Sequence, residues 1–99
     1  MSDSFGGVKL ITIYKYPLKV VDKQYVEMPR GGRVFHVANQ SGIPHIWAEV
    51  DTCQPAVQKV VYMLPTGSDM TDLPDTIKYG GTVHLYNGTL VYHIYVLGC

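Results

Sequence analysis

Short apolar segments separated by turn residues run along the whole chain, and in most of them apolar and polar residues alternate. Alternation with a period of two is typical of β-strands, because successive side chains point to opposite faces of the sheet. Pro17 ends the first segment, since proline donates no hydrogen bond to a sheet, although residues 18–21 could continue the strand beyond a kink. The pattern predicts strands over residues 9–16, 23–28, 33–39, 45–51, 79–86 and 89–97.

Residues 57–64 fit two kinds of element. Apolar residues at positions 57, 60, 61 and 64 have the spacing of one face of a helix. The same stretch holds four β-branched or aromatic residues within six positions, which is typical of a strand. We favour the strand, and the helix is the alternative.

Two hairpins carry the clearest turn signals. Asn87-Gly88 joins the last two segments and is the strongest short-range signal for a tight hairpin, so the numbers of paired residues there should sum to 175. Ser41-Gly42 is the corresponding two-residue loop of the hairpin over 33–51, where paired numbers should sum to 83. The last strand is apolar on both faces, which predicts a central position in its sheet.

The register of the hairpin over 33–51 separates an apolar face from a mixed one. The apolar face is predicted to belong to the core and consists of Phe35, Val37, Ile46, Ala48 and Val50. The mixed face is predicted to be a surface or an interface and consists of Val34, His36, Ala38, His45, Trp47 and Glu49.

These elements predict an all-β protein of six to seven antiparallel strands, arranged as a small sandwich or as a curled, barrel-like sheet. The 99 residues fit a single β domain, which we place at residues 9–99. Residues 1–8 are rich in glycine and serine, which predicts a flexible tail. Residues 65–76 predict a polar loop long enough to contact a partner.

Composition narrows the class of protein. Hydrophobic residues make up 46% of the chain, which excludes a largely disordered protein. Eight lysines and arginines balance eight acidic residues, and this zero net charge argues against general binding to nucleic acid or to a membrane surface. No apolar run approaches the about 20 residues of a membrane helix, and no signal-peptide pattern is present. Cys53 and Cys99 are expected to be free thiols of a cytoplasmic protein.

Catalytic chemistry is not indicated. The sequence has no serine nucleophile elbow, and no pair of acids lies across an evident cleft, so we expect no enzyme. The strand histidines form two pairs on shared faces, and no carboxylate or cysteine is placed to complete a zinc site with either pair. The pairs are His36 with His45 and His84 with His93. We therefore expect neither a metal nor a cofactor.

Two features favour a binding protein. The segment Arg30-Gly31-Gly32-Arg33 is either a tight turn with solvated arginines or a contact for phosphate, since glycine backbone can converge on an anion and arginine donates two parallel hydrogen bonds. Tyrosine and tryptophan on an open sheet face favour recognition, because they supply a large contact area at little entropic cost. The candidate binding residues are Arg30, Gly31, Gly32, Arg33, His36, His45, Trp47, Tyr14 and Tyr16.

Four segments share a pattern with known proteins: Thr12-Ile13-Tyr14-Lys15-Tyr16-Pro17-Leu18, Glu27-Met28-Pro29, Ile46-Trp47-Ala48-Glu49-Val50-Asp51 and Leu90-Val91-Tyr92-His93-Ile94-Tyr95. Together they resemble a family of small uncharacterised proteins of tailed phages and prophage regions, and the likeness covers residues 11–96. Members of that family carry Gly-Thr-Gly after the fifth strand, where this chain has Pro65-Thr66-Gly67. The resemblance implies a viral, intracellular accessory protein and supplies no catalytic residue.

We therefore expect a non-enzymatic phage accessory protein that binds and inhibits a host protein, in particular a defence component, in the host cytoplasm. The alternative is a sponge that sequesters a small phosphorylated or nucleotide signal molecule with aromatic rings and the Arg30–Arg33 loop. A homo-oligomer built on sheet surfaces or edges is also expected, because a zero net charge removes self-repulsion and few charges protect the strands.

Overall fold

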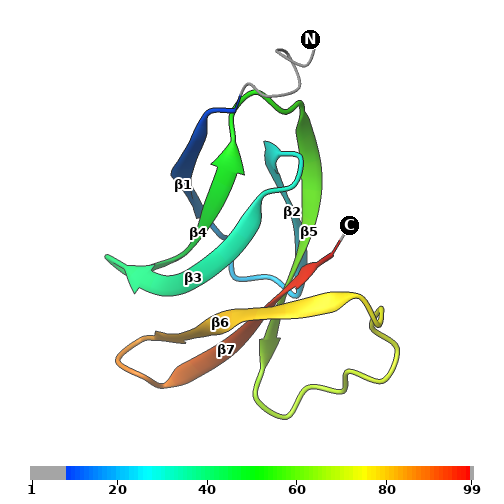
Figure 1. Cartoon of the computed structure of the whole chain (residues 1–99). Helices are drawn as coiled ribbons and strands as arrows, with labels where there is room; N and C mark the ends of the chain where they lie inside the picture. Colours follow the sequence, from blue (N-terminus) through cyan, green and yellow to red (C-terminus); the bar gives the residue numbers. More distant parts are fainter. Residues whose placement is uncertain (1–8, 99) are drawn as a thin grey trace, which may run out of the picture.

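The computed structural model describes residues 9–98 as seven antiparallel strands in two sheets, with no helix in that range and hence none that could span a membrane (Figure 1). The strands are β1 (Ile11–Pro17), β2 (Lys23–Pro29), β3 (Arg33–Gln40), β4 (Ile43–Asp51), β5 (Ala56–Pro65), β6 (Ile77–Leu85) and β7 (Leu90–Leu97). Sheet A has the order β1-β4-β3, and sheet B has the order β2-β5-β7-β6. The all-β prediction is confirmed, and the sheets do not close into a barrel. The predicted tail at 1–8 and Cys99 lie outside the described residues.

Most of the predicted strands are confirmed. The ambiguous segment 57–64 is a strand and forms most of β5, and β7 lies in the interior of sheet B between β5 and β6. The continuation of the first strand over residues 18–21 is wrong. Here the side-chain amide of Gln24 donates to the carbonyl of Lys19 at 2.7 Å, and its oxygen accepts from the Lys19 N–H at 3.0 Å. These two bonds hold the chain in a turn, so it cannot extend.

A β-bulge in β3 changes which side chains face the core. The predicted register, with paired numbers that sum to 83, holds over residues 36–40. One step further Phe35 is an extra residue, and Val34 pairs with Ala48. An extra residue reverses the alternation of side chains beyond it. Val34 therefore packs against the core while Phe35 is 44% exposed, so the prediction that placed Phe35 in the core and Val34 on the mixed face is wrong.

The hairpin of β6 and β7 confirms its predicted turn and contains a second bulge. Asn87 and Gly88 have φ values of 57° and 85°, the left-handed conformation that this type of tight turn requires. Paired numbers sum to 175 over residues 81–85, as predicted, and the register then shifts by one residue at Gly80.

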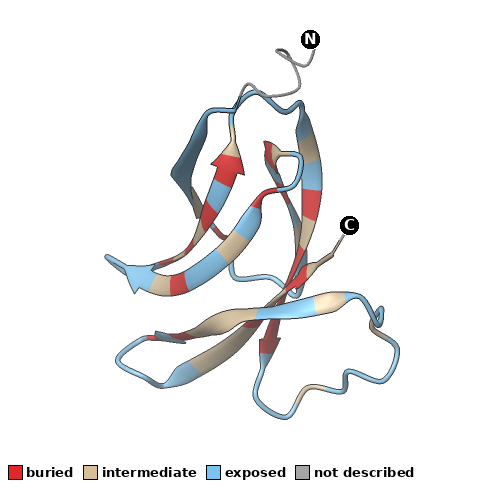
Figure 2. Cartoon of the chain, in the orientation of Figure 1, coloured by how far each residue is buried: buried red, intermediate tan, exposed pale blue. Residues whose placement is uncertain are grey.

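The two sheets approach each other closely where β3 meets β6. A Cβ atom at Gly81 would lie 2.9 Å from the Cβ of Val37, so only glycine fits at this point. The side-chain amide of Asn39 donates to the carbonyl of His84 at 3.2 Å and adds a polar contact between the same strands. The core fills the space between the sheets (red in Figure 2), and it is formed by Leu18, Val26, Met28, Val37, Ile46, Ala48, Val50, Val61, Met63, Val83, Leu85, Ile94 and Val96.

Replacing Gly81 with alanine should destabilise the protein by about 2–4 kcal/mol, because the new methyl group meets Val37 and the backbone conformation is strained. Gly67→Ala is the matched control. Gly67 also has a positive φ, 94°, but its Cβ position is open, so only a strain of about 1 kcal/mol is expected. Urea denaturation followed by circular dichroism measures both variants. Equal losses of stability would contradict the close packing of β3 on β6.

Candidate functional site

The nine predicted binding residues lie in three separate places. His36, His45 and Trp47 share the outer face of sheet A, the face turned away from sheet B, because they alternate with residues of the core along β3 and β4. Tyr14 and Tyr16 lie on the opposite face of β1. Residues 30–32 form the turn from β2 into β3, and Arg33 is the first residue of β3. The sequence therefore identified local groups that do not form one joint site.

Trp47 lies at the centre of the outer face of sheet A. It belongs to the middle strand β4 and is paired with His36 of β3 on one side and with Lys15 of β1 on the other. The centroids of the His36 and His45 rings lie 5.1 Å and 6.0 Å from the centroid of the Trp47 ring. These ring contacts restrict the indole in the free protein, so it would lose little further freedom on binding a partner.

The bulge in β3 adds an aromatic ring and an ion pair beside this centre. The guanidinium carbon of Arg33 lies 6.0 Å from the centroid of the Phe35 ring, and its Nη2 atom lies 3.2 Å from Oε1 of Glu49. Both charged side chains are well exposed, so the pair contributes little to stability but orients the arginine. Ile13, which pairs with Glu49 across β1 and β4, is 57% exposed. The outer face thus has an aromatic centre with aliphatic and charged side chains around it.

Tyr14 and Tyr16 do not belong to that face. Their rings make an edge contact with centroids 6.3 Å apart, and Tyr16 packs against the core. The hydroxyl of Tyr16 is buried and has no hydrogen-bond partner within residues 9–98. Burial, together with the nearby Tyr14, raises the pKa of the Tyr16 hydroxyl above its usual value. These features indicate a packing role for Tyr16 rather than a binding role.

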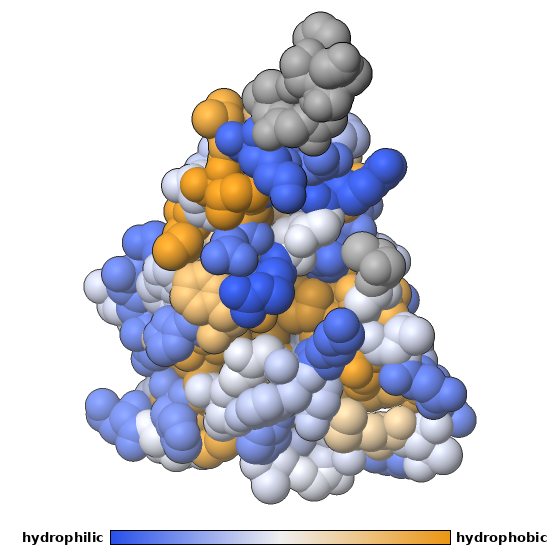
Figure 3. All heavy atoms as spheres, in the orientation of Figure 1, coloured by the Kyte–Doolittle hydropathy of each residue, from blue (hydrophilic) through white to orange (hydrophobic). Residues whose placement is uncertain are grey.

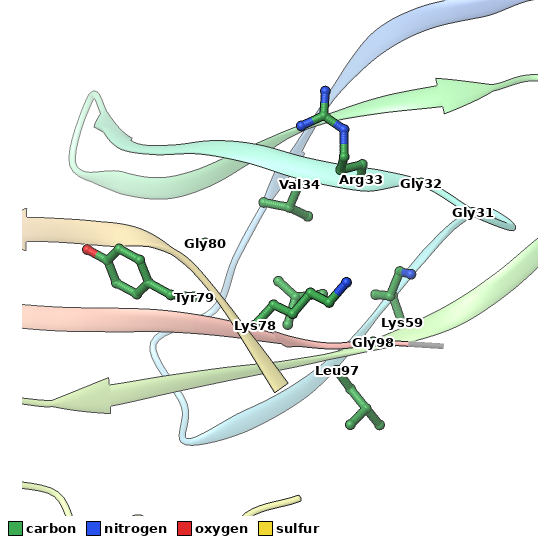
Figure 4. Close-up of a pocket in the computed structure, with 11 residues that line it drawn as sticks. Gly31, Gly32, Arg33, Val34, Lys59, Lys78, Tyr79, Gly80, Leu97 and Gly98 are labelled. Carbon is green, nitrogen blue, oxygen red and sulfur yellow. The ribbon is translucent and has the colours of Figure 1, made fainter. Parts of the chain in front are cut away.

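A hollow of about 260 Å³ opens between the sheets beside the turn at 30–33 (Figure 4). Gly31 and Gly32 line one side of it, and Figure 4 shows Lys59 of β5 and Lys78 of β6 extending toward the same space. Arg30 lines an adjoining hollow of about 440 Å³ that shares Lys59 with the first. Among the described residues, no acidic side chain lines either hollow. The charged residues that line the two hollows are therefore all lysines and arginines.

The turn at 30–33 depends on its glycines, but it does not bring two arginines together. Gly31 has a φ of 83°, and a Cβ atom at Gly32 would lie 2.8 Å from Sδ of Met28. The guanidinium of Arg33 points away from the hollow in Figure 4 and pairs with Glu49. An anion in the hollow would therefore meet glycine backbone and lysines rather than the predicted pair of arginines.

Sequence reasoning missed Lys59 and Lys78. Lys59 is buried, at 7% exposure, on the core-facing side of β5 two residues before Val61, and Lys78 lies on the same face of sheet B, paired with Val96. The two lysines come together because β7 lies between β5 and β6, an order that the sequence does not reveal. One signal in the sequence could have identified Lys59. It lies at a position that the alternation of its strand assigns to the core.

Sheet B carries two histidines, His84 on β6 and His93 on β7. Residues 9–98 contain no group of three or more histidine, cysteine or acidic side chains that could hold a metal ion. His93 instead lies between two hydroxyls, with Nε2 2.7 Å from Oγ1 of Thr66 and Nδ1 3.0 Å from Oγ1 of Thr82. Because Thr66 begins the loop after β5, His93 fastens that loop to sheet B.

Tyr16→Phe should raise the free energy of unfolding by about 1 kcal/mol at neutral pH, because it removes a buried hydroxyl that has no partner. The raised pKa gives a second readout. Because burial disfavours the ionised form, the free energy of unfolding is unaffected by Tyr16 titration below the pKa of the unfolded chain, about 10, and it falls as the pH rises through the raised folded value. Melting curves at neutral and alkaline pH should show a smaller alkaline loss for Tyr16→Phe than for Tyr14→Phe. Equal losses would contradict the burial of Tyr16.

Comparison with known proteins places the whole β domain in one family. A family model described as "Domain of unknown function (DUF7352)" matches residues 10–98. No curated protein and no solved structure matches the chain. The matched range includes all seven strands, and with them the outer face of sheet A and the hollow between the sheets. The chain therefore belongs to the DUF7352 family, a domain of unknown function.

Proposed function

We propose that this protein acts without catalysis, by binding a protein partner on the outer face of sheet A. The observation that carries this proposal is the uncovered aromatic centre of that face. Trp47 lies on the middle strand, and exposed Ile13 and Phe35 lie on the strands beside it. Protein interfaces are enriched in aromatic residues and arginine, and this face has both. Lys15, which pairs with Trp47, donates from Nζ to Oε1 of Gln40 on β3 at 2.6 Å, so one charged side chain lies next to the aromatic centre.

The shape of the face favours a protein over a small molecule. Small ligands are held in concave sites, whereas an open sheet face is broad and shallow. Trp47 with the flanking His36 and His45 supplies a rigid anchor, and the exposed pair of Arg33 and Glu49 supplies a polar rim. A rigid anchor costs little entropy on association, so a small face can still bind well.

The setting that we propose is an accessory role in phage infection, in which the protein blocks a host defence component in the cytoplasm. The resemblance of the chain to small proteins of tailed phages supports this setting. Its small size and the lack of a catalytic motif in its sequence also fit a protein that acts by occupying the surface of another.

A photo-reactive residue in place of Phe35 tests the surface and captures the partner. In host lysate it should give a cross-linked adduct of defined mass, whereas the same residue in place of Tyr86, 70% exposed at the turn of β6 and β7, should not. Trp47→Ala should then raise the Kd of the captured partner about 30-fold, since hot-spot side chains contribute about 2 kcal/mol. Tyr86→Ala should leave the Kd unchanged. Equal adducts at both positions, or an unchanged Kd for Trp47→Ala, would refute the proposal.

A second candidate function is the sequestration of a small phosphorylated molecule in the hollow between the sheets. Lys59, Lys78 and the backbone at Gly31 and Gly32 surround this space. Lysine ammonium groups attract phosphate as point charges. Val34 and Val96 also line the hollow, so a ligand with both a phosphate and an apolar part fits its chemistry.

Calorimetric titration with pyrophosphate and with ADP tests this second function. Saturable binding is expected, and Lys78→Gln should weaken it about tenfold because the Lys78 ammonium group is lost. Lys23→Gln is the control, because Lys23 lies beside the Tyr62 ring, on the face of sheet B away from the hollow. No heat with either ligand at millimolar concentration, or equal effects of the two substitutions, would exclude this function.

A further inference from the structure

Within the described domain, β1 is an open strand edge with apolar side chains on both faces. It forms the rim of sheet A, is hydrogen-bonded to β4 alone, and contains no buried residue (Figures 1 and 2). Leu10, Ile11 and Ile13 are each more than half exposed. The space-filling view shows a hydrophobic patch over β1, at the upper left of Figure 3. Such an edge is a template for pairing with another strand.

The other edge strands of the two sheets carry features that discourage pairing. β3 and β6 contain the bulges at Phe35 and Gly80 and pack on each other. β2 carries the charges of Lys23 and Glu27 and, like β1, ends in a proline. Bulges and charges are usual protection of a sheet edge. By contrast, the register of β1 with β4 is uninterrupted, and Lys15 is its only charged residue.

We infer that β1 pairs with β1 of a second copy of this chain, antiparallel across a twofold axis at Ile13, so that two copies of sheet A form one six-stranded sheet. The unpaired backbone N–H and C=O groups of β1 have the spacing that this pairing requires. The Leu10 carbonyl accepts from the Thr52 N–H and the Leu18 N–H donates to the Pro44 carbonyl, so even-numbered residues bond to β4. The odd-numbered residues 11, 13 and 15 therefore present their N–H and C=O groups to the open edge.

Sequence and charge select this register. With the axis at Ile13, Ile11 lies opposite Lys15 of the partner subunit, and all three odd-numbered residues find hydrogen-bonding partners. An axis one residue earlier would place Lys9 opposite the partner's Lys15, two like charges that repel. An axis one residue later would place Ile11 opposite the partner's Pro17, which has no N–H to donate.

The same register covers apolar side chains on both faces. On the outer face the two copies of Ile13 meet, and on the inner face Leu10 lies opposite the partner's Tyr16. The pairing goes beyond the proposed function and leaves Trp47, on the middle strand, uncovered.

Sedimentation equilibrium of the full chain tests the pairing. The native protein should sediment as a species of twice the 11.0 kDa chain mass. Ile13→Lys should raise the dimer dissociation constant at least tenfold, because two ammonium groups then face each other at the axis. Ile43→Lys is the control, since Ile43 is 48% exposed on the same sheet but lies beyond the residues that pair with β1. A native monomer at high micromolar concentration, or equal effects of the two substitutions, would overturn the inference.

A charge swap distinguishes loss of pairing from loss of folding. Ile13→Lys and Ile13→Glu should each be monomeric, and their equimolar mixture should restore a dimer, because residue 13 then meets an opposite charge at the axis. Failure of the mixture to dimerise while both variants melt as folded proteins would refute the twofold register. A native monomer whose amides at positions 11, 13 and 15 resist hydrogen exchange would show that residues 1–8 occupy the edge instead, which also overturns the inference.

Discussion

The close approach of β3 and β6 determines how the two sheets are arranged. Facing sheets normally stand about 10 Å apart, and side chains fill the gap. Where β6 has glycine, Val37 reaches the backbone of the opposite sheet directly. Because β3 and β6 are edge strands, this contact joins the sheets along one side. The strand at the other side of sheet A, β1, lies away from this contact, and all of its residues except Tyr16 are exposed.

The strands and turns could be predicted because they depend on local chemistry. Alternation identified the strands, and Asn87-Gly88 fixed the last turn, since these residues adopt positive φ readily. The inward and outward directions of side chains could be predicted only as far as the next bulge in each strand. Gly80 indicates the bulge in β6, because glycine inside a strand often marks one. Phe35 does not indicate the bulge in β3, since an apolar residue at that position fits an uninterrupted strand equally well.

The candidate sites differ in how far the sequence reveals them. The grouping of His36, His45 and Trp47 follows from the register of one hairpin, and a correct turn was sufficient to predict it. Lys59 and Lys78 are brought together by a strand that follows both of them in the chain, so no local pattern could pair them. The same limit applies to Arg33. Its partner Glu49 lies across the β3–β4 ladder at a pairing that the bulge shifts by one residue.

The position of the single tryptophan has a consequence for optical measurements. The core contains aliphatic residues, methionine and part of several tyrosines, whereas Trp47 lies on the outer face of sheet A between two imidazole rings. Its indole emission therefore reports on what covers that face, and it is a poor indicator of whether the core is intact. Far-ultraviolet circular dichroism responds to the strands themselves. Recorded together on one sample, the two signals distinguish occupation of the outer face from unfolding of the domain.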